Sequence, residues 1–181
     1  MDVTGLRKML DVQIESYEMD YYQYFPPASL MRLTATAAFS ALRDYGYCYA
    51  DLQKTLKATW MLGMTDMRIY KDIQVTAEQT KLSLYAGPLH RGPKVFMLRM
   101  YALQGEELVS RTDVCVMVVD FQERRVLPSD KVVKALCPPE NEILTESPSR
   151  LVLPEEMEFV FRQDIRHYDC DRNQHLSAYR Y

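Results

Sequence analysis

The chain has 181 residues and a net charge of −3, and 48% of its residues are hydrophobic. This length suffices for one complete domain and part of another. The weak negative charge excludes the basic surface that binds nucleic acid or anionic lipid, and no apolar run reaches the roughly 18 residues of a membrane span. The four cysteines form no CxxC pair and no signal peptide precedes them, so we expect reduced thiols and a cytoplasmic location. Zinc spacing, a GxGxxG motif and a Walker loop are absent from the sequence, so we expect no metal and no cofactor.

The first two predicted elements are a strand and a long helix. Residues 14–24 are aromatic-rich with rough alternation, which predicts a strand that ends at Pro26-Pro27. Ser29 stands at the N-cap position of an apolar-periodic run over residues 30–45, which predicts a helix. Gly46 is a natural stop for this helix. The small side chains of the predicted helix would let another element approach it closely.

Four further strands are predicted after the helix. Val, Ile, Tyr and Phe are frequent in these runs, and turn signals separate the runs. Gly92-Pro93 and residues 104–106 are typical of reversals between antiparallel neighbours. The four runs are residues 67–76, 81–89, 95–103 and 108–120.

The order of these elements predicts the fold class. One antiparallel sheet must bury the apolar face of one helix. A curved antiparallel sheet wrapped around a long central helix meets this requirement, and this α+β architecture is called the hotdog fold. We therefore predict an N-terminal hotdog domain over residues 1–127. Its large apolar side chains are expected in the core: Met31, Phe39, Met67, Tyr85, Phe96 and Met97.

The composition changes after this domain. Residues 128–154 contain five of the nine prolines, which predicts a linker or an extended connection across a surface. Residues 156–167 predict a fresh strand, a polar loop follows, and residues 176–181 could open a helix. This order repeats the layout of residues 14–35. We therefore expect the beginning of a second, C-terminal hotdog domain over residues 155–181.

The polar loop carries the most informative chemistry. Asp171, Asn173 and His175 alternate along it, so in an extended loop their side chains would converge on one site. Aspartate can attack or activate water, histidine can exchange a proton near neutral pH, and asparagine can orient a carbonyl. A helix that begins after His175 would direct its N–H groups at the same place, which suits a developing oxyanion. A solvated turn before a helix has a similar composition and is the alternative.

The loop also resembles a known motif. Residues 169–181, DCDRNQHLSAYRY, are similar to the acyl-ACP thioesterase motif D-x-D-x-N-Q-H-V-N-N-x-K-Y. Ser177-Ala178 depart from it by replacing the usual Asn-Asn pair. The resemblance extends over nearly all of residues 12–181. In the first domain it rests on Trp60 ahead of a strand, on Tyr85-Ala86-Gly87, and on residues 111–128, which end in ERRVLP.

This resemblance implies two tandem hotdog domains, the first selecting the acyl chain and the second performing catalysis. The implied activity is hydrolysis of fatty acyl-ACP thioesters to free fatty acid in fatty acid biosynthesis. The implied catalytic residues are Asp171, Asn173 and His175, together with an acidic residue beyond Tyr181, and some core side chains would line the acyl tunnel. The implied partner is acyl carrier protein. The cationic side chains that could meet this acidic protein are Arg91, Lys94, Arg124, Arg125 and Lys131, although charged turns are usually just solvated.

Two alternatives remain open from the sequence. The chain could be a truncated or non-catalytic hotdog that binds acyl groups, in which case a homodimer could cover its exposed apolar face. It could also be a small acyl-CoA thioesterase with a similar Asp-containing loop, although a linker between two domains argues against this. The two other histidines are expected to be non-catalytic, with His90 at the surface in a turn and His167 structural or exposed at the end of a strand.

Overall fold

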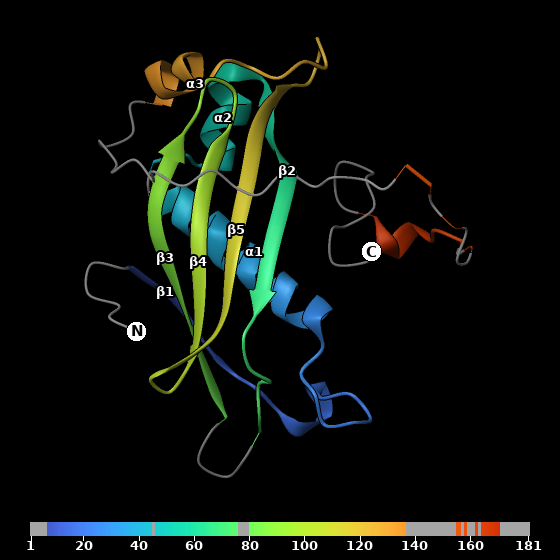
Figure 1. Cartoon of the computed structure of the whole chain (residues 1–181). Coiled ribbons are helices and arrows are strands. Elements are labelled where there is room, and N and C mark those ends of the chain that lie inside the picture. The colour runs from blue at the N-terminus through green and yellow to red at the C-terminus, as the bar shows by residue number, and fades with distance from the viewer. Residues whose placement is uncertain are drawn as a thin grey trace.

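The computed structural model describes residues 7–44, 46–75, 80–136, 155–156, 158, 162 and 164–170. Residues 7–136 of this set form one antiparallel sheet that curves around a long helix, α1 (Pro27–Asp44) (Figure 1). The strand order is β1-β3-β4-β5-β2. This arrangement confirms the predicted α+β architecture of a sheet wrapped around one helix. The strands are β1 (Arg7–Gln13), β2 (Ala58–Ile69), β3 (Lys81–Arg91), β4 (Phe96–Gln104) and β5 (Glu107–Asp120).

The strands β3, β4 and β5 form two hairpins at the reversals that the sequence predicts. The β3–β4 turn is closed by the Gly92 N–H, which donates to the Val95 carbonyl at 2.8 Å. The β4–β5 turn contains Gly105 at φ 62°, a left-handed conformation that glycine adopts without strain. β2 then pairs with β5, and its other edge has no strand partner among the described residues.

Strand β2 begins nine residues before the predicted start at residue 67, at Ala58. Its first half is interrupted by a register shift between Leu62 and Met64, at Gly63, which breaks the regular pattern of a strand in the sequence. Trp60 therefore lies inside β2 and not ahead of it.

The predicted strand over residues 14–24 is wrong. The first strand is β1, which ends at Gln13, and residues 14–24 form a 3₁₀ turn, η1 (Ser16–Glu18), and a loop. The aromatic alternation misled the prediction, because Tyr17 and Tyr21 are 83% and 90% exposed and do not mark a buried face. Ile14 is the fully buried side chain at the start of this segment.

Helix α1 lies at the centre of the fold. It begins at Pro27, three residues before the predicted start, because proline has the right φ for a first helical position and needs no N–H partner there. Within the described ranges, no helix is both long and apolar enough to cross a membrane. Small residues on the buried face let α1 lie close to the sheet, as the sequence predicts. This face consists of Leu30, Thr34, Ala37, Ala38, Ala41 and Leu42.

Two short helices cover the end of the sheet and were not predicted. Helix α2 (Tyr49–Leu56) precedes β2. Helix α3 (Ser129–Leu136) contacts α2. The Ser129 hydroxyl donates to the Gly92 carbonyl, and Val132 is fully buried. The beginning of the predicted linker therefore packs on the first domain, while residues 137–154 lie outside the described part of the chain.

An aromatic cluster anchors the core beside α2. The rings of Tyr47, Trp60 and Phe96 pack edge to face, with centroids between 4.9 and 6.0 Å apart. The Trp60 indole N–H donates to the Tyr47 carbonyl at 3.2 Å, so this buried polar group is satisfied. Of the predicted core, Phe96 and Met97 are buried, and Met31, Met67 and Tyr85 are partly buried. Phe39 is 48% exposed, so the prediction was wrong for this residue.

Replacing Phe96 by alanine is expected to lower the free energy of unfolding by about 3–5 kcal/mol, because it opens a cavity between Tyr47 and Trp60. Chemical denaturation followed by circular dichroism measures this loss. Phe121→Ala is the matched control, since Phe121 is 43% exposed and its removal should change stability by under about 0.5 kcal/mol. Equal losses in the two variants would show that the cluster does not anchor the core.

Candidate functional site

The three side chains that the sequence assigns to catalysis are not among the described residues. Asp171, Asn173 and His175 lie beyond Cys170, where the described part of the chain ends. Their predicted convergence on one site therefore stays a prediction. His90 belongs to β3 and not to a turn, and His167 is exposed at the start of a 3₁₀ turn, η2 (His167–Asp169), and not at the end of a strand.

The turn η2 brings the chain directly to the predicted catalytic loop. Its backbone is closed by the Asp169 N–H, which donates to the Arg166 carbonyl at 2.9 Å, and by the Cys170 N–H, which donates to the His167 carbonyl at 3.3 Å. The Asp169 carboxylate accepts a hydrogen bond from the Arg166 N–H at 2.9 Å. Asp169 is buried, whereas Arg166, His167 and Tyr168 are exposed, so this reciprocal cap lies at the surface of the protein with its carboxylate turned inward.

The first domain contains the same turn before α1. In η1 the Glu18 N–H donates to the Glu15 carbonyl at 2.9 Å, and the Met19 N–H donates to the Ser16 carbonyl at 3.3 Å. The Glu18 carboxylate accepts from the Glu15 N–H at 3.0 Å. The preceding residues have φ, ψ of −101°, 153° at Glu15 and −98°, 158° at Arg166. The two turns therefore share both their backbone path and their capping bonds.

The sequences around the two turns also match. The offset between Glu15 and Arg166 is 166 − 15 = 151 positions. At this offset a carboxylate, Glu18 or Asp169, caps both turns. The two turns thus match in residue identities as well as in backbone path, and the second hotdog domain stays a prediction. The identical pairs are Ile14 and Ile165, Tyr17 and Tyr168, Asp20 and Asp171, and Gln23 and Gln174.

The loop after η1 is organised by one carboxylate. Asp20 Oδ1 accepts hydrogen bonds from the backbone N–H groups of Tyr22 and Tyr24, each at 2.9 Å. The Asp20 N–H donates to the Tyr24 carbonyl at 2.8 Å, and the Gln23 N–H donates to the Asp20 carbonyl at 3.0 Å. Gln23 has φ 67°, so the chain reverses tightly there. This loop brings the chain to Pro27, where α1 begins.

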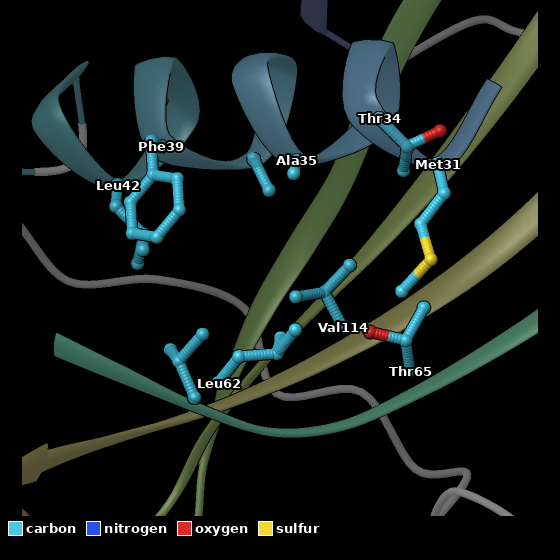
Figure 2. A pocket seen from close by; sticks show the side chains of 10 residues that line it. Met31, Thr34, Ala35, Phe39, Leu42, Leu62, Thr65 and Val114 are labelled. Atoms are coloured by element: carbon cyan, nitrogen blue, oxygen red, sulfur yellow. The ribbon is translucent and has the colours of Figure 1, made fainter. Parts of the chain in front are cut away.

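A pocket opens between α1 and the strands β2 and β5 (Figure 2). Its cavity volume is about 40 Å³, and the whole hollow measures about 430 Å³ when the space open to solvent is included. In Figure 2 the Met31 side chain reaches from α1 towards Thr65 of β2. Phe39 and Leu62 are 48% and 37% exposed, so the pocket opens to solvent beside them. The lining residues are Met31, Thr34, Ala35, Ala38, Phe39, Leu42, Leu62, Thr65, Val114 and Val116.

The lining of this pocket decides what it can hold. Apart from the two threonines it is made of apolar side chains, and none of its residues is titratable. It is therefore suited to an apolar chain and supplies no acid or base of its own. Sequence reasoning placed Met31 and Phe39 in the core, whereas both line the pocket. The small residues Ala35 and Ala38 leave room for the pocket on this stretch of helix, but their residue type does not distinguish a pocket lining from the core.

Charged side chains of both signs lie where β5 ends and α3 begins, with Arg125 and Lys131 near Asp120. Backbone N–H groups of Glu123 and Gln122 lower the pKa of Asp120 by hydrogen bonding to its carboxylate, and the nearby charges of Lys131 and Arg125 lower it further. The exposed side chains among those predicted to meet a carrier protein are Lys94, Arg124, Arg125 and Lys131. The Arg91 side chain is outside the described part of the structure. Among the described residues, no group of three His, Cys, Asp or Glu side chains could hold a metal ion.

Comparison with known proteins identifies the fold. No protein-family model matches the sequence, and no curated protein matches it. The structure of an acyl-ACP thioesterase from Bacteroides thetaiotaomicron is similar with a TM-score of 0.76 and 16% identity, over 99% of this chain and 72% of that chain. A Lactobacillus plantarum protein assigned as an oleoyl thioesterase is similar with a TM-score of 0.73 and 14% identity, over 96% of this chain and 67% of that chain.

Shorter proteins match only part of the chain. The structure of a DHNA-CoA thioesterase from Staphylococcus aureus is similar with a TM-score of 0.60 and 11% identity, over 70% of this chain and 82% of that chain. At these identities the likeness concerns the fold, and together with the sheet and helix described above it shows that the protein has the hotdog fold.

Proposed function

We propose that this chain belongs to an acyl-ACP thioesterase, which hydrolyses fatty acyl thioesters on acyl carrier protein and releases free fatty acid for lipid metabolism in the cytoplasm. The observation that carries the proposal is the repeated turn. The first copy leads through a capped loop into α1, and the second copy leads directly to Asp171, Asn173 and His175. This supports a second hotdog domain whose active-site loop contains these three residues.

The pocket beside α1 supports the choice of substrate. An acyl chain would lie between α1 and the strands β2 and β5, in contact with Met31, Phe39 and Leu62. Burial of each methylene group there would contribute about 0.8 kcal/mol to binding. The pocket has no charged lining, so it suits the hydrocarbon part of the substrate, and the thioester must react elsewhere. The loop of the second domain is our candidate for that place.

The proposed chemistry is hydrolysis of the thioester carbonyl. Asn173 and the N-terminus of the following helix would position the carbonyl and stabilise its developing negative charge. His175 and Asp171 would promote the addition of water to this carbonyl, directly or through a covalent intermediate. The carbon–sulfur bond breaks, the thiolate takes a proton, and the products are a fatty acid and the free thiol of the carrier.

The proposed carrier is a protein. Lys94, Arg124, Arg125 and Lys131 are exposed, and these cationic side chains would meet an acidic carrier protein. A small acyl-CoA thioesterase is the weaker candidate. The Staphylococcus aureus enzyme that acts on a CoA thioester leaves 30% of this chain unmatched (100 − 70), whereas the acyl-ACP thioesterase matches 99% of it.

Purified full-length protein tests the proposal when it is incubated with acyl-ACPs of several chain lengths and with the corresponding acyl-CoAs. We expect saturable release of free thiol, with a higher kcat/KM for the ACP substrates. Acyl binding without thiol release would instead support a non-catalytic acyl-binding module. A higher kcat/KM for acyl-CoA would contradict the assignment of the carrier.

A further inference from the structure

The pocket beside α1 contains one buried hydroxyl group without a hydrogen-bond partner. Thr34 is 2% exposed, and its Oγ1 atom has no partner among the described residues. Two positions later in the same helix, the Thr36 hydroxyl donates to the Arg32 carbonyl at 3.0 Å, a bond of the kind that Thr34 does not make. Leaving a buried hydroxyl unpaired is unfavourable, so Thr34 requires a partner that the described part of the chain does not supply.

A second hydroxyl lies on the opposite wall of the pocket. Thr65 belongs to β2 and is partly buried, and Figure 2 shows it at the same end of the pocket as Thr34, with the Met31 side chain beside it. The other lining residues are apolar. Thr34 and Thr65, which we call the threonine pair, are therefore the polar groups that could fix the orientation and identity of a ligand in this pocket.

A saturated acyl chain would leave the threonine pair unsatisfied, because hydrocarbon neither donates nor accepts a hydrogen bond. A hydroxyl group on the chain, in contrast, can donate to one threonine and accept from the other. Rotation of Thr34 about χ1 exchanges its hydroxyl with its methyl group and can direct the hydroxyl to such a ligand. This rotation breaks no hydrogen bond, since the hydroxyl makes none with the described residues.

We infer that the acyl chain bound in this pocket carries a hydroxyl group, which lies between Thr34 and Thr65. This inference rests on the proposed function and narrows its substrate class to hydroxy-fatty acyl thioesters. The alternative partner is an ordered water, for which the cavity of about 40 Å³ has room. A retained water would serve saturated and hydroxylated chains alike, whereas the inference requires a preference for the hydroxylated chain.

Binding of free fatty acids to the full-length protein tests the inference, because it requires no catalysis. Isothermal titration calorimetry compares a saturated fatty acid with its monohydroxy derivatives of the same chain length, with the hydroxyl at successive carbons. We expect one derivative to bind at least about tenfold more tightly than the unsubstituted acid. Equal or weaker binding of every derivative, or no binding of any of these acids, would overturn the inference.

Thr34→Val tests the role of the buried hydroxyl, because valine keeps the shape of threonine and lacks its hydroxyl. We expect the favoured derivative to bind this variant at least about tenfold more weakly than it binds the wild type. The unsubstituted acid should bind about threefold more tightly, because it no longer buries an unpaired hydroxyl. A preference for the hydroxylated acid that survived in Thr34→Val would contradict the inference.

Ser110→Ala is the matched control. Ser110 is 1% exposed on β5, its hydroxyl also has no partner among the described residues, and it does not line the pocket. Its removal should leave the preference for the hydroxylated acid unchanged. Loss of this preference in Ser110→Ala as well would overturn the inference, because the effect would then not come from the pocket.

Release of thiol from acyl-ACP and hydroxyacyl-ACP separates this inference from the proposed function. We expect kcat/KM to be at least about tenfold higher for the hydroxylated substrate. A wild type that prefers the hydroxylated acid in binding but hydrolyses no thioester would refute the proposed function and support the chemistry assigned to the pocket. A wild type that hydrolyses acyl-ACP but shows no preference in binding would refute the inference alone.

Discussion

Replacing His175 by alanine in the full-length protein is expected to lower kcat/KM for acyl thioester hydrolysis at least about a hundredfold. Imidazole exchanges protons near neutral pH, and in our account His175 is the group that supports the addition of water at the thioester. The measurement is release of free thiol from acyl-ACP over a range of substrate concentrations.

The control for this variant is His167→Ala. His167 is exposed, lies eight positions earlier (175 − 167) and belongs to the turn η2, so its loss should change kcat/KM by less than about threefold. Circular dichroism should show that both variants are folded. Unchanged turnover in His175→Ala would remove His175 from the catalytic residues and, with it, the main support for the loop as the active site.

Ala35→Phe is expected to produce the second large effect, which depends on the length of the acyl chain. Ala35 lines the pocket from α1, so a phenyl ring there would occupy the space proposed for the substrate. We expect kcat/KM for long acyl chains to fall at least about tenfold more than for short ones. The phenyl ring would exclude the distal methylene groups of a long chain, whereas a short chain has no methylene groups at that depth to lose. The assay compares acyl-ACPs of short, medium and long chains.

Thr36→Phe is the matched control for Ala35→Phe. Thr36 is the next residue of α1, is exposed, and does not line the pocket, so the same bulk is added outside it. We expect its chain-length profile to equal that of the wild type. If Ala35→Phe lowered kcat/KM for all chain lengths by the same factor, the pocket would not be the place where the acyl chain lies.

The sequence was sufficient to predict the centre of the fold. The apolar period of α1, the apolar runs of β3 and β4 and the Val-rich run of β5 give strong local signals, and the glycine at position 105 marks a reversal. The first strand was misplaced because exposed tyrosines such as Tyr21 imitate the alternation of a strand. Helix α3 was missed because the prolines around it suggested a linker, and the contacts that stabilise it, with α2 and with the Gly92 carbonyl, come from distant parts of the sequence.

The catalytic loop of the candidate site stays a prediction, because its residues lie outside the described part of the chain. The residues of the loop stand out by their chemistry, and the repeat behind them could have been read from identical pairs such as Tyr17 and Tyr168. The pocket could not be predicted, because side chains that line it, such as Met31 and Leu42, belong to the same residue types as the core. Which of them face a cavity is decided by how closely α1 lies on β2 and β5.

The most direct test of the account is a crystal structure of the full-length protein with a non-hydrolysable acyl-pantetheine analogue. We expect its acyl chain between α1 and the strands β2 and β5, with the side chains of Asn173 and His175 within hydrogen-bonding distance of the group that replaces the thioester. A structure in which the chain lies elsewhere, and in which Asn173 and His175 point away from that group into solvent, would contradict the thioesterase that we propose.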